Sequence, residues 1–592
     1  MSRSPRRARA LASLTAVAGL GLAGAAVTTS PAQSAAPAGD CAVAFPVDQL
    51  AAGDAVTGLT VTHGTTPEGF TGEVLGVLDD GIGPDVDMVM VRLTSPEIDR
   101  VGIWQGMSGS PVYAADGRLI GAVSYGLAMG SSPVAGVTPY DHMDDHMADP
   151  MQDGIAVDRT AARQIARGSD VSAARAEQGF AQLPMPLGVA GVGAGRLTAA
   201  AARAGDRSWL PRSAYAVGRA GAADATAGDI VAGGNLAASL AYGDVTMAGV
   251  GTATSVCGDR VVGFGHPLDY SGSTTLAMHP ADAIYVQEDL VAGFKVANLG
   301  APVGTITDDR LAGITGTIGA LPATTDITSS LTYADRSRTG VSHVTLDTPD
   351  ALASTAFYEL LANHQAVVDG PIKGSEDLAW TITGTDGDGT PFELHSSDLY
   401  SSSSDLTYRL GFGLGDLVYG IARMGGVSID SVTTDSTLRD DVTSFKISRV
   451  QARQGGEWVT VSRHSGLVVR GGGRLAVRVT LTGGGTTTVL PGSLDVPARF
   501  SGRLGFFGVA GGSRVDLGRP PRDLGQMQAW LDRQVRHDEV VVLLARGPRV
   551  HSGHASVTAA ARRAGTPRYV QTVLGPVGGV VRGQAVSEAF IR

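Results

Sequence analysis

At 592 residues the chain is longer than the roughly 250–300 residues that one hydrophobic core serves, which excludes a single-domain protein. Its 17% charged and 43% apolar residues exclude a disordered chain, and a net charge of −11, with no long basic run beyond the first ten residues, argues against a nucleic-acid partner. Glycine, at 82 residues, is about twice as common as the average usage of ~7%, which favours many turns between short strands.

The N-terminus has the pattern of a removable signal peptide, for which we expect the range 1–38. Arg3, Arg6 and Arg7 precede an apolar run at about 10–27, and the small residues PAQSAAPAG follow it. A retained membrane anchor is the alternative, but the run is rich in Ala and Gly and lacks bulky side chains. We therefore expect a secreted, extracellular or wall-associated protein with no membrane span in the mature chain. The sequence does not decide between the export routes.

The two cysteines, Cys41 and Cys257, both lie in the expected exported part. An oxidising compartment allows them to form one disulfide. The alternative is a pair of buried thiols. We predict the disulfide.

Along the chain, short β-rich runs alternate with turn clusters from Val43 to Pro139, which predicts a small antiparallel β-barrel. Ala- and Arg-rich stretches with helical spacing follow to about Ala204, and strands return from about Ala227. Further on, the sequence predicts helices in ALASTAFYELLANHQAVV, GDLVYGIARM and LGQMQAWLDRQV, and a β-sandwich in the strand-rich C-terminal part.

The segment GMSGSPVYAADGRLIGAVSYG places Ser108 between Gly106 and Gly109, on a loop that enters a β-hairpin. Glycine lets the backbone fold tightly enough for neighbouring N–H groups to converge on the oxyanion of an acyl transfer. The amides of Gly106 and Ser108 are the candidate oxyanion hole. The segment differs from the G-x-S-x-G elbow, because Ser110 takes the second Gly position and a strand follows. An ordinary Ser in a glycine-rich turn is the alternative.

The segments GLTVTHGTTPEGF, GIWQGMSGSPVY and DGRLIGAVSYG, with the later GDVTMAGVGTATSV, VVGFGHPLDYSG and FKVANLGAPVGTITDDRLAGITG, resemble the SpoIVB peptidase family. Its members are serine peptidases related to the chymotrypsin-like double β-barrel. The resemblance implies that Ser108 is the nucleophile and His266 the catalytic histidine, with the two halves in permuted order. It implies a mainly β fold, with a double β-barrel peptidase-like core, connecting helices and a C-terminal β-sandwich-like region. We expect a Ser-bearing barrel half at 39–150, a helical or irregular connector at 151–225, a His-bearing barrel half at 226–325, a mixed α/β region at 326–430 and the sandwich-like region at 431–592.

As a peptidase, the chain would use His266 to accept the proton of Ser108 and return it to the leaving amine. Asp269, close to His266 in sequence, and Asp99, near the family position, are the candidate orienting carboxylates. A Ser–His dyad oriented by a backbone or polar group stays open. His63 is a further base candidate, for which a surface role is the alternative.

We expect a protein or peptide substrate, self-processing as an open option, and no metal or cofactor. The sequence leaves the oligomeric state open. His142 and His146, at i and i+4 with Asp145 between them, suit a metal if helical, whereas a short helix packed by Met143 and Met147 is the simpler interpretation. The alternative function is a catalytically inactive peptidase fold that serves as a binding module of the envelope or extracellular space.

Overall fold

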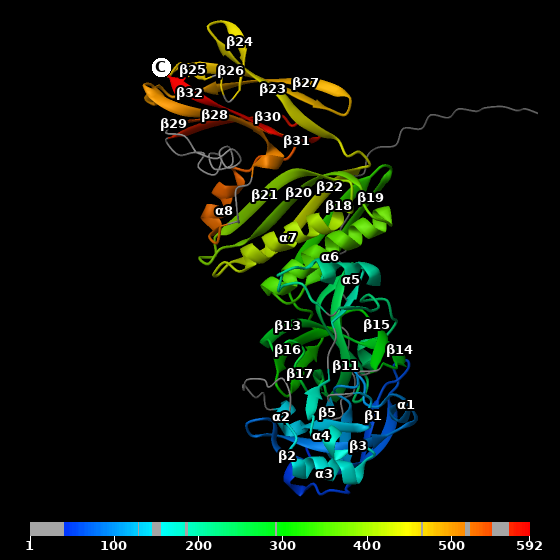
Figure 1. Cartoon of the computed structure of the whole chain (residues 1–592). Coiled ribbons are helices and arrows are strands. Elements are labelled where there is room, and N and C mark those ends of the chain that lie inside the picture. Colours follow the sequence, from blue (N-terminus) through cyan, green and yellow to red (C-terminus); the bar gives the residue numbers. More distant parts are fainter. Residues whose placement is uncertain are drawn as a thin grey trace, which may run out of the picture.

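The computed structural model describes residues 41–592 except 128–129, 145–155, 184–186, 213, 290–292, 463, 465, 516–520 and 547–567. The described chain is mainly β, with 49% of its residues in strands and 18% in helices, as the sequence predicted. The expected signal peptide and the candidate metal ligands Asp145 and His146 lie outside the described residues. In Figure 1 the chain forms a column, with the first barrel at one end and the C-terminal sandwich at the other.

The first β-barrel closes because strand β4 pairs with both β1 and β5. Its strands alternate buried and exposed positions where one face meets water, whereas β5 is buried along its whole length. In pairing order the six strands are β1 (Ala55–Thr60), β2 (Glu68–Gly83), β3 (Val86–Thr94), β6 (Val134–Pro139), β5 (Leu119–Leu127) and β4 (Pro111–Ala114), and β7 (Phe180–Gln182) extends the sheet beside β5.

The second β-barrel is closed by pairing of β10 with β11 inside a thirteen-stranded sheet. Together the two closed barrels confirm the predicted double-barrel core. In pairing order the six strands are β10 (Asn235–Gly243), β13 (Gly272–His279), β16 (Gly304–Arg310), β17 (Gly313–Ile318), β12 (Arg260–Gly263) and β11 (Thr246–Cys257), with β8 (Gly188–Ala190) and β9 (Tyr215–Ala216) beyond β11 and a separate hairpin of β14 (Ala281–Gln287) and β15 (Phe294–Leu299).

The sheet of the second barrel continues into the next part of the chain, because β10 also pairs with β19. The residues expected as a separate mixed α/β region therefore share a sheet and a hydrophobic core with the His-bearing barrel. Two helices, α6 (Pro349–Val368) and α7 (Thr407–Ala422), cover one face of this extension (Figure 1). Its strands are β19 (Arg336–Val344), β18 (Thr325–Tyr333), β22 (Ser428–Arg439), β20 (Gly374–Thr385) and β21 (Pro391–Ser402).

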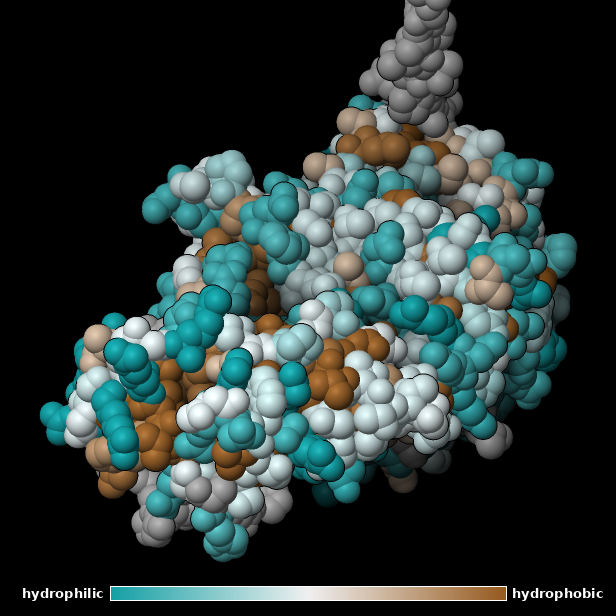
Figure 2. Space-filling model, turned by 90° about the horizontal axis from the view of Figure 1, so that it is seen from above, coloured by the Kyte–Doolittle hydropathy of each residue, from teal (hydrophilic) through white to brown (hydrophobic). Residues whose placement is uncertain are grey.

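The C-terminal part is the predicted β-sandwich, in which two five-stranded sheets enclose one apolar core. From above, Figure 2 shows mostly hydrophilic and neutral residues with separate hydrophobic patches. One sheet holds β24 (Glu457–Thr460), β23 (Ser444–Gln454), β26 (Arg474–Gly483), β27 (Thr486–Asp495) and β31 (Val580–Arg582); the other holds β25 (Leu467–Val469), β32 (Gln584–Ile591), β28 (Arg503–Gly511), β29 (Val540–Arg546) and β30 (Tyr569–Leu574).

The other α-helices of the described chain are short. Among the described residues, no helix has the length and apolar character needed to cross a membrane. No cluster of metal-ligating side chains occurs in the described ranges. These helices are α1 (Pro96–Val101), α2 (Tyr140–Asp144), α3 (Arg159–Gly168), α4 (Ala173–Ala176), α5 (Ala194–Arg203) and α8 (Leu524–Leu531).

Cys41 and Cys257 form the predicted disulfide. Cys257 is the last residue of β11, so the covalent bond joins the start of the described chain to the second barrel. The segment that follows Cys41 reaches the first barrel, where Ala44 bridges to Leu119 of β5. The disulfide therefore links the two barrels through the N-terminal segment.

Candidate active site

Ser108 lies on the loop between α1 and β4 of the first barrel. Two tight turns shape this loop, because the N–H of Met107 donates to the carbonyl of Trp104 and that of Ser110 donates to the carbonyl of Met107. Trp104 and Met107 are fully buried and anchor the loop to the barrel core. The core of the first barrel thus holds the loop in place, and the Ser108 side chain faces His266 of the second barrel.

Glycine is required at two positions of the Ser108 loop. Gly106 and Gly109 have φ angles of +92° and +95°, a region that side-chain-bearing residues rarely adopt. A Cβ atom on Gly109 would also lie 1.9 Å from the carbonyl oxygen of Thr252. The missing side chain therefore lets the loop rest directly on β11 of the second barrel.

His266 reaches Ser108 because the backbone bends sharply after β12. Phe264 and Gly265 have φ angles of +67° and +72°, and the buried Phe264 ring packs in the core of the second barrel. A Cβ atom on Gly265 would lie 2.0 Å from Oγ of Ser124, so this turn passes against the first barrel. The hydroxyl of Thr138 donates to the carbonyl of Gly265 at 2.6 Å and ties the two barrels together.

Hydrogen bonds across the barrel interface also hold the Ser108 loop. The N–H of Thr252 donates to the carbonyl of Ser108 at 2.8 Å. The hydroxyls of Thr252 and Thr254 donate to the carbonyls of Gly106 and Gly109 at 3.2 and 2.8 Å. These buried bonds fix the loop relative to β11 and hence relative to His266.

The structure brings Ser108 and His266 into direct contact. The distance from Nε2 of His266 to Oγ of Ser108 is 2.8 Å, and that from Nδ1 to the carbonyl oxygen of Pro267 is also 2.8 Å. A carbonyl only accepts, so Nδ1 carries the proton and Nε2 of the neutral ring accepts from the Ser108 hydroxyl. This tautomer is the one that a general base needs.

Burial keeps the His266 ring neutral. Removal from solvent lowers the pKa of His266 to about 4, and the hydrogen bond to the carbonyl of Pro267 opposes this shift. The Ser108 and His266 side chains are only 1% and 0% exposed. The pair is therefore aligned for proton transfer but enclosed by the protein in this state.

Of the other sequence-predicted residues, none contributes the group at Nδ1 of His266, which faces the Pro267 carbonyl. Asp99 is exposed on α1 and accepts a hydrogen bond from Thr94 at 3.0 Å. Asp269 is exposed too, although partial desolvation, with the negative charges of Asp309 and Asp350, raises the pKa of its carboxyl. His63 is also exposed.

Asp309, which sequence reasoning missed, is the carboxylate that organises the loop after His266. It is fully buried on β16 and accepts from the N–H groups of Leu268, Asp269 and Ser271 at 2.7, 2.8 and 3.2 Å. Its position in TITDDRLAG carries no local mark of this role, because its partners lie about 40 residues away in sequence.

The two predicted oxyanion-hole amides differ from their neighbours. The N–H of Gly109 donates to the carbonyl of Val123, whereas no described residue accepts a hydrogen bond from the N–H of Gly106 or Ser108. Buried backbone N–H groups without an acceptor are rare and call for an explanation. An incoming carbonyl oxygen would satisfy them.

Lys295 is a second residue that the sequence did not single out. Its side chain is buried beside the Ser108 loop, and a Cβ atom on Gly106 would lie 2.8 Å from Cβ of Lys295. The ammonium donates to Oδ1 of Asn235 at 2.9 Å, and Asn235 donates in turn to the carbonyl of Gly64 in the first barrel. Desolvation lowers the pKa of Lys295 to about 7.

A second Ser–His pair is buried in the second barrel, between β10 and β13. Oγ of Ser239 lies 2.8 Å from Nε2 of His279, whose Nδ1 is 3.0 Å from the carbonyl oxygen of Gly300. Both side chains are fully buried, and desolvation lowers the pKa of His279 to about 4. Ser239, however, lies within β10, paired with Ala248 on one side and Ala277 on the other.

The arrangement around Ser108 is thus a serine hydroxyl, a neutral imidazole and two N–H groups without an acceptor among the described residues, assembled from two barrels. Comparison with known proteins adds no assignment. No protein-family model, curated protein or solved structure matches this chain.

Proposed function

We propose that the protein is a secreted serine endopeptidase that hydrolyses peptide bonds of protein or peptide substrates through Ser108 and His266. The observation that carries this proposal is the 2.8 Å hydrogen bond from the Ser108 hydroxyl to Nε2 of His266, beside the N–H groups of Gly106 and Ser108. The disulfide between Cys41 and Cys257 supports export, since such bonds persist in oxidising compartments.

In the proposed reaction, Oγ of Ser108 attacks the substrate carbonyl while Nε2 of His266 takes the hydroxyl proton. The carbonyl oxygen becomes an oxyanion that accepts hydrogen bonds from the N–H groups of Gly106 and Ser108. The tetrahedral intermediate then collapses, the C–N bond breaks and His266 gives its proton to the leaving amine. Water, deprotonated by His266, hydrolyses the acyl-enzyme and restores Ser108.

The carbonyl of Pro267 would take the orienting role that a carboxylate has in a Ser-His-Asp triad. It holds the Nδ1–H tautomer, as a carboxylate does. It carries no full negative charge, so it stabilises the imidazolium of the transition state less. A Ser–His dyad with a main-chain orienter is therefore the form of the mechanism that we propose.

One observation favours the second candidate, an inactive peptidase fold that acts as a binding module. Ser108 and His266 are 1% and 0% exposed, so a substrate carbonyl has no direct approach to Oγ in this state. Catalysis would require the surrounding segments to move apart, whereas a binding module would keep the pair as a structural hydrogen bond.

Labelling with a fluorophosphonate separates the two candidates, because this probe phosphonylates only an activated Ser. The folded secreted protein and its Ser108→Ala, His266→Ala and Ser239→Ala variants would be treated in parallel. The peptidase proposal expects labelling of the wild type and of Ser239→Ala, and none of the other two. A folded wild type that stays unlabelled, or labelling that survives Ser108→Ala, would overturn it in favour of the binding module.

A further inference from the structure

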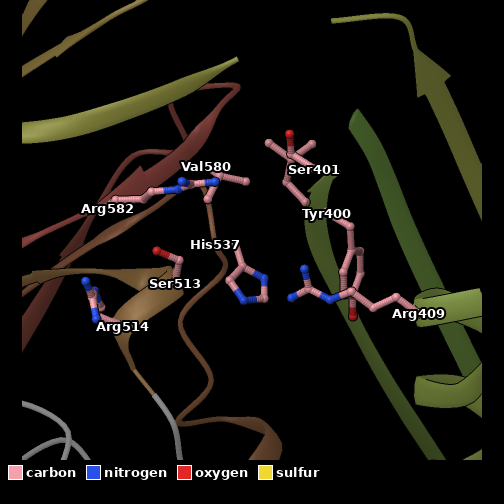
Figure 3. A pocket seen from close by; sticks show the side chains of 9 residues that line it. Tyr400, Ser401, Arg409, Ser513, Arg514, His537, Val580 and Arg582 are labelled. Carbon is pink, nitrogen blue, oxygen red and sulfur yellow. The ribbon is translucent and has the colours of Figure 1, made fainter. Parts of the chain in front are cut away.

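A cavity of about 300 Å³ lies where the sandwich meets the sheet extension, far along the chain from Ser108. Figure 3 shows its side chains: Tyr400, Ser401 and Arg409 lie on one side, Ser513, Arg514 and Arg582 lie on the other, and His537 lies between them. The first three come from β21 and α7, and the others come from the sandwich part of the chain.

The charge of this pocket is one-sided. Three of its nine lining residues are arginines, and none of the nine is acidic. Arg409 comes from α7, Arg514 from the short 3-10 helix Gly512–Arg514 and Arg582 from β31. Among the described residues, no carboxylate forms an ion pair with Arg409 or Arg582. Like charges that converge on one cavity repel one another, and an anion between them removes that cost.

The nearby carboxylates are already committed to other groups. Asp398 accepts from the N–H of His537 at 2.6 Å and lies against Nδ1 of its ring. Asp377 and Asp538 both bind Arg536, the residue before His537, at 3.1 and 3.0 Å. These contacts neutralise Arg536 and leave Arg409 and Arg582 without a paired carboxylate among the described residues.

The same contacts make the floor of the pocket rigid. Besides Asp377, Arg536 donates to the hydroxyl of Ser397 at 2.7 Å, which docks this loop of the sandwich on β21. On the other side, the N–H of Val581 donates to the carbonyl of His537 at 2.8 Å. The ring of His537 lies 5.7 Å from that of Tyr400. A site held from both parts of the chain is organised before a ligand arrives.

One neutral donor completes the pocket. The buried hydroxyl of Ser401 has no hydrogen-bond partner among the described residues, whereas the hydroxyl of Ser513 on the opposite wall donates to the carbonyl of Val581. Guanidinium groups from three elements approach from several directions, and Figure 3 shows that of Arg409 pointing toward His537. A carboxylate accepts in one plane, whereas a phosphate group presents oxygens in three dimensions.

We propose that this junction pocket binds a phosphate group through Arg409, Arg582 and the hydroxyl of Ser401. The site is independent of the peptidase proposal, because it shares no residue with the Ser108 region. Its ligand bridges the sandwich and the sheet extension and so stabilises their junction. A free phosphate compound and a lipid headgroup offer the same group.

Calorimetric titration of the mature protein with inorganic pyrophosphate, in a phosphate-free buffer of low salt, tests the site. We expect saturable one-site binding that weakens about tenfold or more in Arg409→Gln and in Arg582→Gln. Arg474→Gln is the matched control, since Arg474 pairs with Asp495 elsewhere on the sandwich and its loss changes the net charge equally. Its affinity should stay within about twofold of the wild type.

Absence of saturable binding by the folded wild type would overturn the proposal. So would an equal loss in Arg474→Gln, or binding of succinate as tight as that of pyrophosphate. Co-sedimentation with phosphatidylglycerol vesicles, lost in Arg409→Gln and Arg582→Gln, would assign the group to a lipid headgroup. Pyrophosphate binding without co-sedimentation would assign it to a free phosphate compound.

Discussion

The two buried Ser–His pairs of this protein have nearly the same side-chain geometry but different backbones. In both pairs Nε2 lies 2.8 Å from the Ser Oγ and Nδ1 faces a main-chain carbonyl, of Pro267 in one pair and of Gly300 in the other. Ser108 sits in a loop of left-handed glycines at a barrel interface, whereas Ser239 sits inside a strand paired on both sides.

That difference makes only the Ser108 pair a candidate for the proposed chemistry. Successive N–H groups of a strand point to opposite edges and are used in the ladder, so they cannot converge on an oxyanion. The turns around Ser108 leave the N–H groups of Gly106 and Ser108 without an acceptor among the described residues. A Ser–His hydrogen bond alone is thus a poor sign of catalysis, and the neighbouring amides supply the distinction.

Separate substitution of the two histidines should give the largest difference in labelling rate. We expect His266→Gln to lower the rate constant of fluorophosphonate labelling by on the order of 10³-fold or more, because Ser108 loses its base. His279→Gln should change it less than about threefold. Equal losses in two folded variants, measured by single-turnover labelling, would show that the pairs do not differ in function.

A substitution at Gly109 tests the close backbone contact between the Ser108 loop and β11. Gly109→Ala meets both a φ of +95° and a carbonyl oxygen 1.9 Å away, so we expect a loss of about 3 kcal/mol or more in stability. The matched control is Gly117→Ala, which has a φ of +85° but nothing within 4 Å and should lose about 1–2 kcal/mol. Urea unfolding measures both, and similar losses would refute the close contact with β11.

The two pairs should contribute equally to the loss of folding stability at acid pH. The folded pKa of His266 and of His279 is about 4, below the 6.5 of an ordinary histidine, so the unfolded chain binds more protons between these values. Stability is therefore full above about pH 6.5 and falls as the pH drops toward 4. We expect His266→Gln and His279→Gln each to reduce the loss between pH 7 and 4.5 by about 2–3 kcal/mol. Denaturant unfolding at the two pH values measures it, and an unchanged loss would contradict burial of the neutral rings.

Lys295 lies beside the Ser108 loop. It should give a smaller change in folding stability, above pH 7. Its folded pKa of about 7 lies below the usual 10.5, so the unfolded chain again binds more protons and stability rises with pH above about 7. Lys295→Met should flatten this rise by on the order of 1 kcal/mol per pH unit. Unfolding curves between pH 7 and 9 measure it; a slope equal to that of the wild type would argue that Lys295 is hydrated.

Much of this architecture was predictable from local patterns. Short β-rich runs predicted strands in both barrels, and the segment ALASTAFYELLANHQAVV predicted the helix that became α6. The loop around Ser108 was visible because its glycines and hairpin are contiguous in sequence. The boundary expected near 325 had no such support, since pairing of β10 with β19 joins residues about 100 apart into one sheet.

The sequence by itself determined that Ser108 stands in a glycine-rich turn, that two cysteines can pair and that the chain is mainly β, because each of these depends on residue type or short-range spacing. Only the tertiary structure decided which groups meet His266: Ser108, 158 residues earlier, on one side and the carbonyl of Pro267 on the other. Asp309 and Lys295 were equally hidden. The packing of two closed barrels, which no local pattern encodes, gives these residues their neighbours and their desolvation.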